Sequence, residues 1–242
     1  CIRDRVQAAG GKTLAVSSQK QLNQALKTVK GKNAVITVKA GKNVKITIPK
    51  GTYKVTIRVV GKKAAVVNNG TVKEIVVNSK GTVAIKNNGT IKKVTVQNAK
   101  SVSFSGNCKK AVPVVVNAED VSMILAAPAK ITAKKDVNIV LKKGAEKSSI
   151  TCTKNVQAQV DNQTKKAISV KIADGTTLKV ESGESCTITP KGKKEDTSGE
   201  DKTDGKDQKT DDTSDGNASS GSSSSGNSSG CLLYTSPSPR DR

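Results

Sequence analysis

The chain has 242 residues, of which 42 are Lys or Arg and 20 are Asp or Glu, so its formal charge is +22. It contains no His and no Trp, one Met, and only three aromatic residues: Tyr53, Phe104 and Tyr234. The absence of His excludes Ser-His-Asp and Cys-His catalysis and His-ligated metals. Three aromatic residues cannot form a platform that stacks on sugars or bases. No run of eighteen apolar residues occurs, so we expect no membrane span.

The two ends of the chain do not read as natural protein sequence. Residues 1–5 and residues 231–236 can be encoded by DNA strings that are partly reverse complements of each other. The pair resembles the inverted ends of transposase-based sequencing adapters, and residues 237–242 resemble the rest of such an adapter. We therefore exclude residues 1–5 and 231–242 from the fold prediction, and we expect the natural protein to continue beyond at least one end.

Residues 6–11 precede the first predicted element. Val6-Gln7-Ala8 followed by Ala9-Gly10 resembles the small-residue cleavage site of a signal peptide. We interpret this segment as the remnant of an export signal, and we expect the protein to be extracellular or on the cell surface.

Residues 12–32 are predicted to hold a short capping helix. Ser18 and Gln21 have the spacing of a capping box, and Leu22, Ala25, Leu26 and Val29 recur at helical spacing within residues 17–29. A short helix with one apolar stripe, placed directly before a first strand at residues 34–38, would cover the open end of a repeat structure. The alternative is an ordinary helix packed elsewhere.

Residues 33–190 carry a nineteen-residue repeat. The segment 68–73, Asn-Asn-Gly-Thr-Val-Lys, returns as Asn-Asn-Gly-Thr-Ile-Lys at 87–92. A fixed period near twenty, with apolar residues alternating inside short segments, indicates a solenoid. The ladders that we predict from this period are Val77, Val96 and Val115; Val83, Val102 and Val121; and Asn69, Asn88 and Asn107.

The composition of the repeat favours strands. Its apolar positions are mainly Val and Ile, which suit pleated surfaces, and the frame of a leucine-rich repeat is absent. Stacked coils would pair their backbones about 4.8 Å apart. Asn at an equivalent turn position in each coil can form an amide ladder, and we expect Gly70 and Gly89 to supply positive φ. The fold class is therefore all-β: a parallel β-helix of roughly eight coils.

The nineteen-residue period, the ladders of stacked residues and the capping helix, which we call the lid, together resemble the right-handed parallel β-helices of the pectin-lyase-like superfamily. Within it, the pattern is most similar to the Lys-, Val- and Asn-rich segments of large bacterial surface proteins. The resemblance covers residues 12–190 and implies a fold. It implies little about activity, because this architecture hosts lyases, adhesins and spacers.

Residues 191–230 change abruptly in composition. They hold six Lys and nine acidic residues, a net charge of −3, and end in a Ser- and Gly-rich run with almost no apolar residue. Such a segment cannot offset the entropy of ordering, so we predict a disordered linker. A linker of this kind indicates a further downstream domain or a wall anchor.

We find no pattern that predicts catalysis, a metal site or a cofactor. Asp120 and Asp136 fall beside equivalent apolar positions, and Asn155 follows them. Two neighbouring carboxylates could hold a cation, but hard cations usually take more oxygen ligands, and we favour the alternative of solvated turn residues.

Three Cys remain inside the trimmed chain: Cys108 at a turn, Cys152 on the apolar ladder and Cys186 in the final strand. Without His as a base, we assign them no site.

The excess of Lys belongs to the repeat. Residues 6–190 hold 31 Lys, Arg58 and nine acidic residues, a net charge of +23. Lys54, Lys73 and Lys92 recur at nineteen-residue spacing, so we expect one column of ammonium groups. The column either keeps the protein soluble and blunts edge pairing, or it binds an anionic polymer such as an acidic polysaccharide, a cell-wall polymer or DNA, in a salt-dependent way.

The sequence as a whole predicts a non-catalytic stalk or adhesin-like spacer of an exported bacterial protein. Its expected partners are anionic polysaccharides or wall polymers, with no sequence-specific nucleic acid. The alternative is a module that binds or cleaves acidic glycans, which would need acidic residues and Arg clustered on one face.

Overall fold

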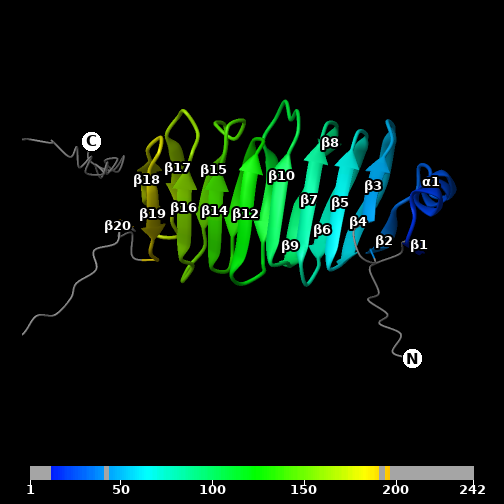
Figure 1. Ribbon diagram of the computed structural model, residues 1–242, viewed down its shortest axis with the longest axis horizontal. Coiled ribbons are helices and arrows are strands. Elements are labelled where there is room, and N and C mark those ends of the chain that lie inside the picture. Colours follow the sequence, from blue (N-terminus) through cyan, green and yellow to red (C-terminus); the bar gives the residue numbers. More distant parts are fainter. Residues whose placement is uncertain (1–11, 41–43, 191–193, 197–242) are drawn as a thin grey trace, which may run out of the picture.

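The protein is a parallel β-solenoid of about eight turns with coils of about 19 residues. The computed structural model describes residues 12–40, 44–190 and 194–196. The adapter-like ends, the segment 6–11 and most of the proposed linker lie outside these residues. Figure 1 shows the coils stacked side by side along the long axis, with two sheets facing each other.

Sheet 1 forms one side of the solenoid, and sheet 2 forms the other. Along sheet 1 the chain contributes β1 (Lys12–Val16), β2 (Ala34–Ala40), β4 (Thr52–Gly61), β6 (Thr71–Asn78), β8 (Thr90–Ile91), β9 (Val94–Asn98), β11 (Val112–Val116), β13 (Ala129–Ala133), β15 (Ser149–Cys152), β17 (Ile168–Lys171) and β18 (Thr177–Val180). Along sheet 2 it contributes β3 (Val44–Ile48), β5 (Lys63–Asn68), β7 (Thr82–Asn87), β10 (Ser101–Ser105), β12 (Val121–Ala126), β14 (Val137–Leu141), β16 (Ala158–Asn162), β19 (Ser185–Ile188) and β20 (Lys194–Asp196).

The apolar core fills the space between the two sheets. Alternate residues of each strand point inward, as in β10, where Val102 and Phe104 are buried and the three Ser are half-buried. Val77 pairs with Val96, and Val83 pairs with Val102; all four are at most 1% exposed. The predicted column of stacked aliphatic side chains is thus confirmed for these coils.

Two of the predicted ladders are wrong beyond the fifth coil. Val96 pairs with Val116, and Val115 points outward and is half-buried. Val102 pairs with Met123, while the buried Val121 pairs with Val137 in the next coil. The turn at residues 106–111 adds one residue to the nineteen-residue period, which shifts the partner of Val96 to Val116. The turn at residues 117–120 adds another, which shifts the partner of Val102 to Met123.

Gly70 and Gly89 are needed for space and not for positive φ. Gly70 and Gly89 are absent from the described residues with positive φ, so our expectation for them is wrong. A Cβ at Gly89 would collide with the carbonyl oxygen of Gly70, and a Cβ at Gly81 with that of Lys62. Asp120 (51°) and Asn155 (62°) are the two described residues other than glycine that have positive φ.

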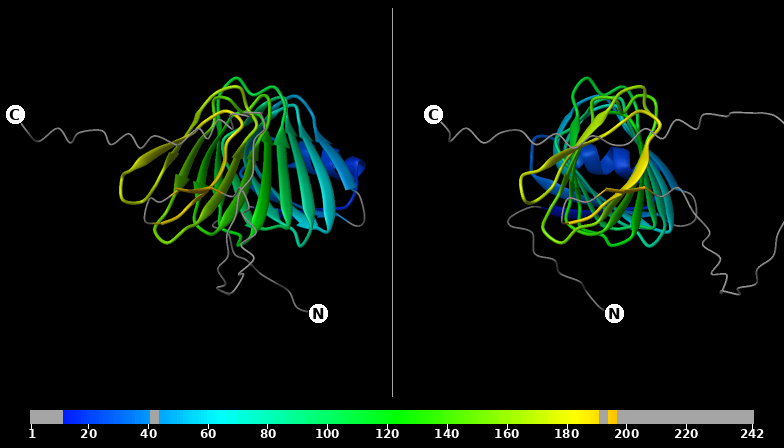
Figure 2. Two further views of the ribbon diagram at one scale, coloured as in Figure 1. Left: turned by 60° about the vertical axis from the view of Figure 1, so that its left-hand side comes forward. Right: turned by 90° about the vertical axis from the view of Figure 1, so that its left-hand side faces the viewer.

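The helix α1 (Gln19–Thr28) covers the N-terminal end of the solenoid, as predicted. Seen along the solenoid axis in Figure 2, it lies across the opening between the sheets. Leu22, Ala25 and Leu26 are buried and join the core. Ser18 Oγ accepts a hydrogen bond from Gln21 N (3.3 Å). The strand β1, which we did not predict, precedes the helix and pairs with β2.

The C-terminal end is closed by reversing the strands. The strand β18 folds back on β17, so that Val170 pairs with Leu178 in antiparallel order. In sheet 2, β19 is antiparallel to β16, and β20 is antiparallel to β19. Residues 194–196 therefore form a strand, although our prediction placed them in the linker. A chain that turns back pairs the free edge of the last coil without a further coil.

Candidate functional site

The predicted lysine row consists of Lys54, Lys73 and Lys92, which are all exposed. Each lysine directly follows one of three residues that pair across successive coils: Tyr53 with Val72, and Val72 with Ile91. The structure therefore brings the three lysines to neighbouring positions in three successive coils. Between Tyr53 and Thr56 the register shifts by one residue, so Lys54 lies in a bulge of β4. Within the described part of the chain, none of the three forms an ion pair.

An acidic residue lies beside this lysine row, but other groups engage it. Glu74, next to Lys73, accepts a hydrogen bond from Thr95 Oγ1 (2.6 Å), and its carboxylate lies 3.7 Å from Lys93 Nζ.

On the same outer face of sheet 1, Arg58 pairs in register with Val76. Among the described residues, Arg58 Nε is buried and has no hydrogen-bond partner. The ion pairs of the described residues are Lys93 with Glu74 and Lys135 with Glu119, so Arg58 has no carboxylate partner among them.

Two asparagine columns stand at the turn that precedes the lysine row. The predicted column of Asn69, Asn88 and Asn107 is confirmed for one rung, since Asn88 Nδ2 donates to Asn69 Oδ1 (3.0 Å). Asn107 is exposed and, within the described ranges, makes no hydrogen bond to Asn88, so the ladder does not extend to it. The longer turn at residues 106–111 carries Asn107 away from the repeat position.

The buried asparagine column was missed by the sequence analysis. Asn68 and Asn87 are at most 1% exposed, and Asn68 Nδ2 donates to Asn87 Oδ1 (2.8 Å). The two side chains also accept hydrogen bonds from the backbone N–H groups of Gly70 and Gly89, both at 3.3 Å. In the next coil, Asn87 Nδ2 contacts Cys108 Sγ (3.3 Å). The doubled Asn-Asn at 68–69 and 87–88 was the available signal, because one member of each pair must point inward.

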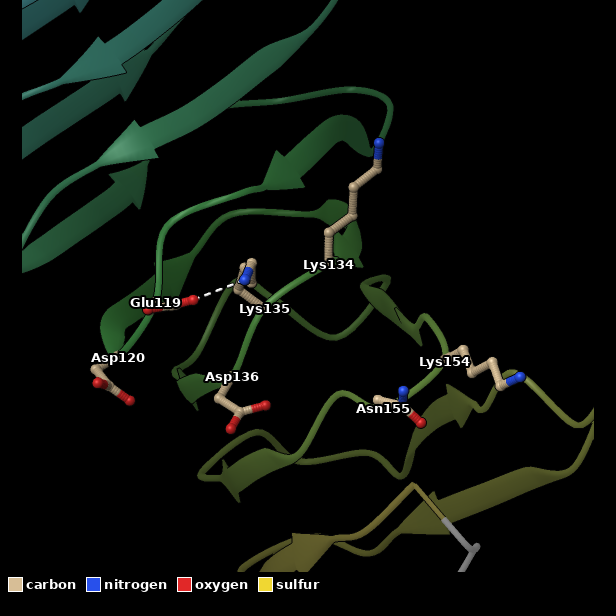
Figure 3. Close-up of a pocket in the computed structure, with 7 residues that line it drawn as sticks. All are labelled: Glu119, Asp120, Lys134, Lys135, Asp136, Lys154 and Asn155. Carbon is tan, nitrogen blue, oxygen red and sulfur yellow. Dashed lines mark hydrogen bonds and ion pairs between the residues drawn. The ribbon is translucent and has the colours of Figure 1, made fainter.

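A charged pocket of about 360 Å³ lies at the opposite corner of the solenoid (Figure 3). Its lining residues come from three successive turns and are Glu119, Asp120, Lys134, Lys135, Asp136, Lys154 and Asn155. Lys135 Nζ donates to Glu119 Oε1 (2.6 Å), and this contact lowers the pKa of the Glu119 carboxyl and raises the pKa of Lys135. The lining thus holds three acidic residues and three lysines, of which Lys135 contacts an acidic side chain.

The two carboxylates that we considered for a cation lie at one edge of this pocket. Asp120 N donates to the carbonyl oxygen of Asp136 (3.1 Å), which places the residues in adjacent coils as expected. The Asp136 carboxylate accepts a hydrogen bond from Gln157 N (2.8 Å), so Gln157, and not Asn155, follows in the register. No group of three or more His, Cys, Asp or Glu side chains that could hold a metal occurs among the described residues.

The described cysteines are free thiols in two environments. Cys152 and Cys186 are buried in the core, and Cys152 pairs with Ala133 as predicted. Burial raises the pKa of Cys152 from 9.0 to about 11, so this thiol stays protonated at neutral pH. Cys108 is half-buried at the turn, and burial raises the pKa of its thiol, partly offset by the hydrogen bond from Asn87.

No helix in the described part of the chain has both the length and the apolar character required to cross a bilayer. No protein-family model matches the chain, and neither a curated protein nor a solved structure matches it at a significant level. The resemblance to the pectin-lyase-like superfamily stays a prediction, whereas the parallel β-solenoid is what the structure itself establishes.

Proposed function

We propose that this chain is the solenoid stalk of an exported bacterial surface protein, and that its lysine row binds anionic polymers. The observation that carries the proposal is the alignment of Lys54, Lys73 and Lys92 in successive coils, with no ion pair to an acidic residue in the described part of the chain. Bare ammonium groups about 4–5 Å apart repel one another by roughly 1 kcal/mol in water. A polymer that carries repeated negative charges along the solenoid axis would relieve this repulsion.

The solenoid supports the role of a spacer through its continuous sheets. Sheet 1 and sheet 2 each extend through successive coils, and both ends are covered, one by α1 and the other by antiparallel strands. About eight coils at a spacing of about 4.8 Å give a body roughly 40 Å long. A closed, hydrogen-bonded body of this kind would hold a partner domain at a fixed distance.

The chemistry of the row favours recognition by charge. Lysine is a point charge with a flexible stem, whereas Arg forms the planar bidentate contacts that read the shape of a carboxylate or phosphate. Since the row consists of lysines, we expect binding to be driven by the release of counterions. Added salt reduces the free energy gained from this release, so the affinity should fall steeply as the salt concentration rises.

Retention on heparin resin at low salt tests the binding. The full chain should elute at a higher salt concentration than the triple variant Lys54→Gln/Lys73→Gln/Lys92→Gln. The matched control is Lys62→Gln/Lys80→Gln/Lys100→Gln, which removes the same charge from exposed positions at the other corner. Equal elution of the two triple variants would discard the row as a site. Release of unsaturated sugar from a polyuronate would instead support a cleaving module.

The surface location has its own test. The protein produced from its natural gene should be digested by a protease added to intact cells. Full protection of the chain in cells that remain intact would contradict an exported stalk.

A further inference from the structure

A groove lies beside the lysine row, where one turn of the solenoid is longer than its neighbours. Residues 88–93, which include β8, lead from β7 to β9, and residues 106–111 lead from β10 to β11. Lys86 pairs with Ser105 and Val94 pairs with Val114, so the later turn is one residue longer. The longer turn leaves a groove of about 710 Å³ against the shorter one. Pockets of this size hold small ligands such as short oligosaccharides.

The groove is positively charged. Lys92, Lys109 and Lys110 line it, and all three are exposed. No acidic residue belongs to its lining, in contrast to the pocket of Figure 3, where acidic residues and lysines are equal in number. An empty groove therefore holds three like charges near one another, and an anion would be attracted by all three.

The uncharged polar groups of the groove suit hydroxyl groups. Asn88 Nδ2 donates to Asn69 Oδ1, whereas Asn88 Oδ1 accepts no hydrogen bond among the described residues. Asn107 and the Thr90 hydroxyl add further donors and acceptors to the lining. Sugar hydroxyls both donate and accept, so they match amides and a hydroxyl better than an acceptor-only phosphate chain does.

The apolar part of the lining excludes a base-stacking ligand. Ile91, Val112 and Pro113 contribute aliphatic surface, and no aromatic side chain lines the groove. Single-stranded nucleic acids gain much of their affinity from stacking on aromatic residues. The combination of ammonium groups, amides and aliphatic surface therefore favours an acidic saccharide over a nucleic acid.

We propose that this groove is a subsite that binds a short segment of a negatively charged oligosaccharide. The inference rests on the proposed function of the lysine row, with which it shares Lys92. The row would hold the polymer along the solenoid axis by charge, and the groove would select for a hydroxylated chain at the point where Asn88 and Asn107 face it.

Cys108 lines the groove and provides a direct readout. Iodoacetamide labels this thiol in the full chain, and peptide mass mapping separates its rate from those of the other cysteines. A heparin tetrasaccharide should slow the labelling of Cys108 at least threefold at low salt. Neutral maltotetraose should leave the rate unchanged. Equal protection by a short oligothymidylate of the same charge would overturn the selection for a saccharide.

Two variants separate the groove from the row. Lys109→Gln/Lys110→Gln should abolish the protection of Cys108 and retain most of the binding to heparin resin. Lys54→Gln/Lys73→Gln should weaken retention on the resin and keep the protection. The control Lys142→Gln/Lys143→Gln removes the same charge from exposed positions of a later turn at the same corner, and circular dichroism checks that each variant folds. Protection that persists in Lys109→Gln/Lys110→Gln would overturn the groove alone, whereas loss of retention in every variant equally would overturn the row.

Discussion

The side-chain amide of Gln19 makes two hydrogen bonds with the backbone of Thr47. Thr47 N donates to Gln19 Oε1 (2.7 Å), and Gln19 Nε2 donates to the Thr47 carbonyl oxygen (2.8 Å). Thr47 lies in β3, the first strand of sheet 2, whose outer edge has no strand beside it in the described residues. The amide thus occupies the place that the backbone of a further strand would take, and it protects this edge from pairing with another chain.

We predict that Gln19→Ala destabilises the protein by about 1–3 kcal/mol, because it leaves a half-buried N–H and C=O of Thr47 without their partners. The variant should also self-associate through the exposed edge of β3. Urea unfolding measures the first effect, and light scattering measures the second. The control Lys20→Ala changes an exposed neighbour on the same helix. Unchanged stability and a monomeric variant would show that the helix alone covers this edge.

A second prediction separates two roles of glycine. Since a Cβ at Gly89 would meet the carbonyl oxygen of Gly70, Gly89→Ala and Gly89→Asn should both lower the free energy of unfolding, by about 1–3 kcal/mol as for overpacking. Gly31 has a φ of 75° and open space around it, so Gly31→Asn should be tolerated, because Asn adopts this backbone conformation. Urea denaturation of the three variants compares them. An unchanged free energy of unfolding for Gly89→Asn would instead support positive φ as the role of this glycine, as the repeat first suggested.

Sequence patterns predicted the solenoid and its lid because both depend on periodicity. Stacked coils require the same residue type at the same position, which is visible as Val77, Val96, Val83 and Val102 at nineteen-residue spacing. The lid follows from a separate, helical spacing of Leu22, Ala25 and Leu26. Neither inference depends on contacts between distant parts of the chain.

The register of the later coils could not be read in the same way. In β11, Val114, Val115 and Val116 are identical side chains, so composition does not tell which of them point inward. Pro113 on the exposed face was the one available signal, since it fixes the alternation of the strand. In β12, a shift of two residues exchanges Val121 for Met123 and keeps the same face inward, so alternation cannot detect it.

The groove beside Cys108 and the C-terminal closure could not be predicted from the sequence, for a related reason. The groove exists because residues 106–111 form a longer turn against a shorter one, and nothing in the composition of that turn distinguishes a protruding loop from a register slip. The antiparallel pairing of β17 and β18 depends on which direction the chain takes after Ile172, which alternation of apolar residues does not specify. The lysine row, by contrast, follows directly from the repeat.

A third prediction concerns the end of the buried amide column. Asn87 Nδ2 contacts Cys108 Sγ, which is a weak acceptor. Cys108→Asn would place an amide oxygen there and continue the column of Asn68 and Asn87, so we expect the free energy of unfolding to rise by about 1 kcal/mol. The comparison variant is Cys108→Ala, which removes the acceptor and should lower stability. Equal unfolding midpoints for the two variants in urea would show that the column ends at Asn87.

A fourth prediction follows from the raised pKa of Cys152. In the unfolded chain this thiol ionises near its ordinary value of 9.0, whereas in the folded protein its pKa is about 11. The neutral thiol therefore contributes stability that is fully present below pH 9 and is lost as the pH rises from 9 to 11, because the unfolded state then binds fewer protons. The loss should reach about 1 kcal/mol by pH 10.

Cys152→Ala should remove this alkaline loss, although it lowers stability at every pH by leaving a small cavity. The measurement is the free energy of unfolding in urea at intervals between pH 8 and pH 10.5 for the original protein and the variant. Titration of the lysines affects both proteins alike, so the difference between their slopes isolates the thiol. The half-buried Thr151 next to it provides a control, since Thr151→Ala should keep the slope of the original protein. Parallel curves for the original protein and Cys152→Ala would mean that solvent reaches this thiol and that the column of stacked side chains is open at the rung formed by Ala133 and Cys152.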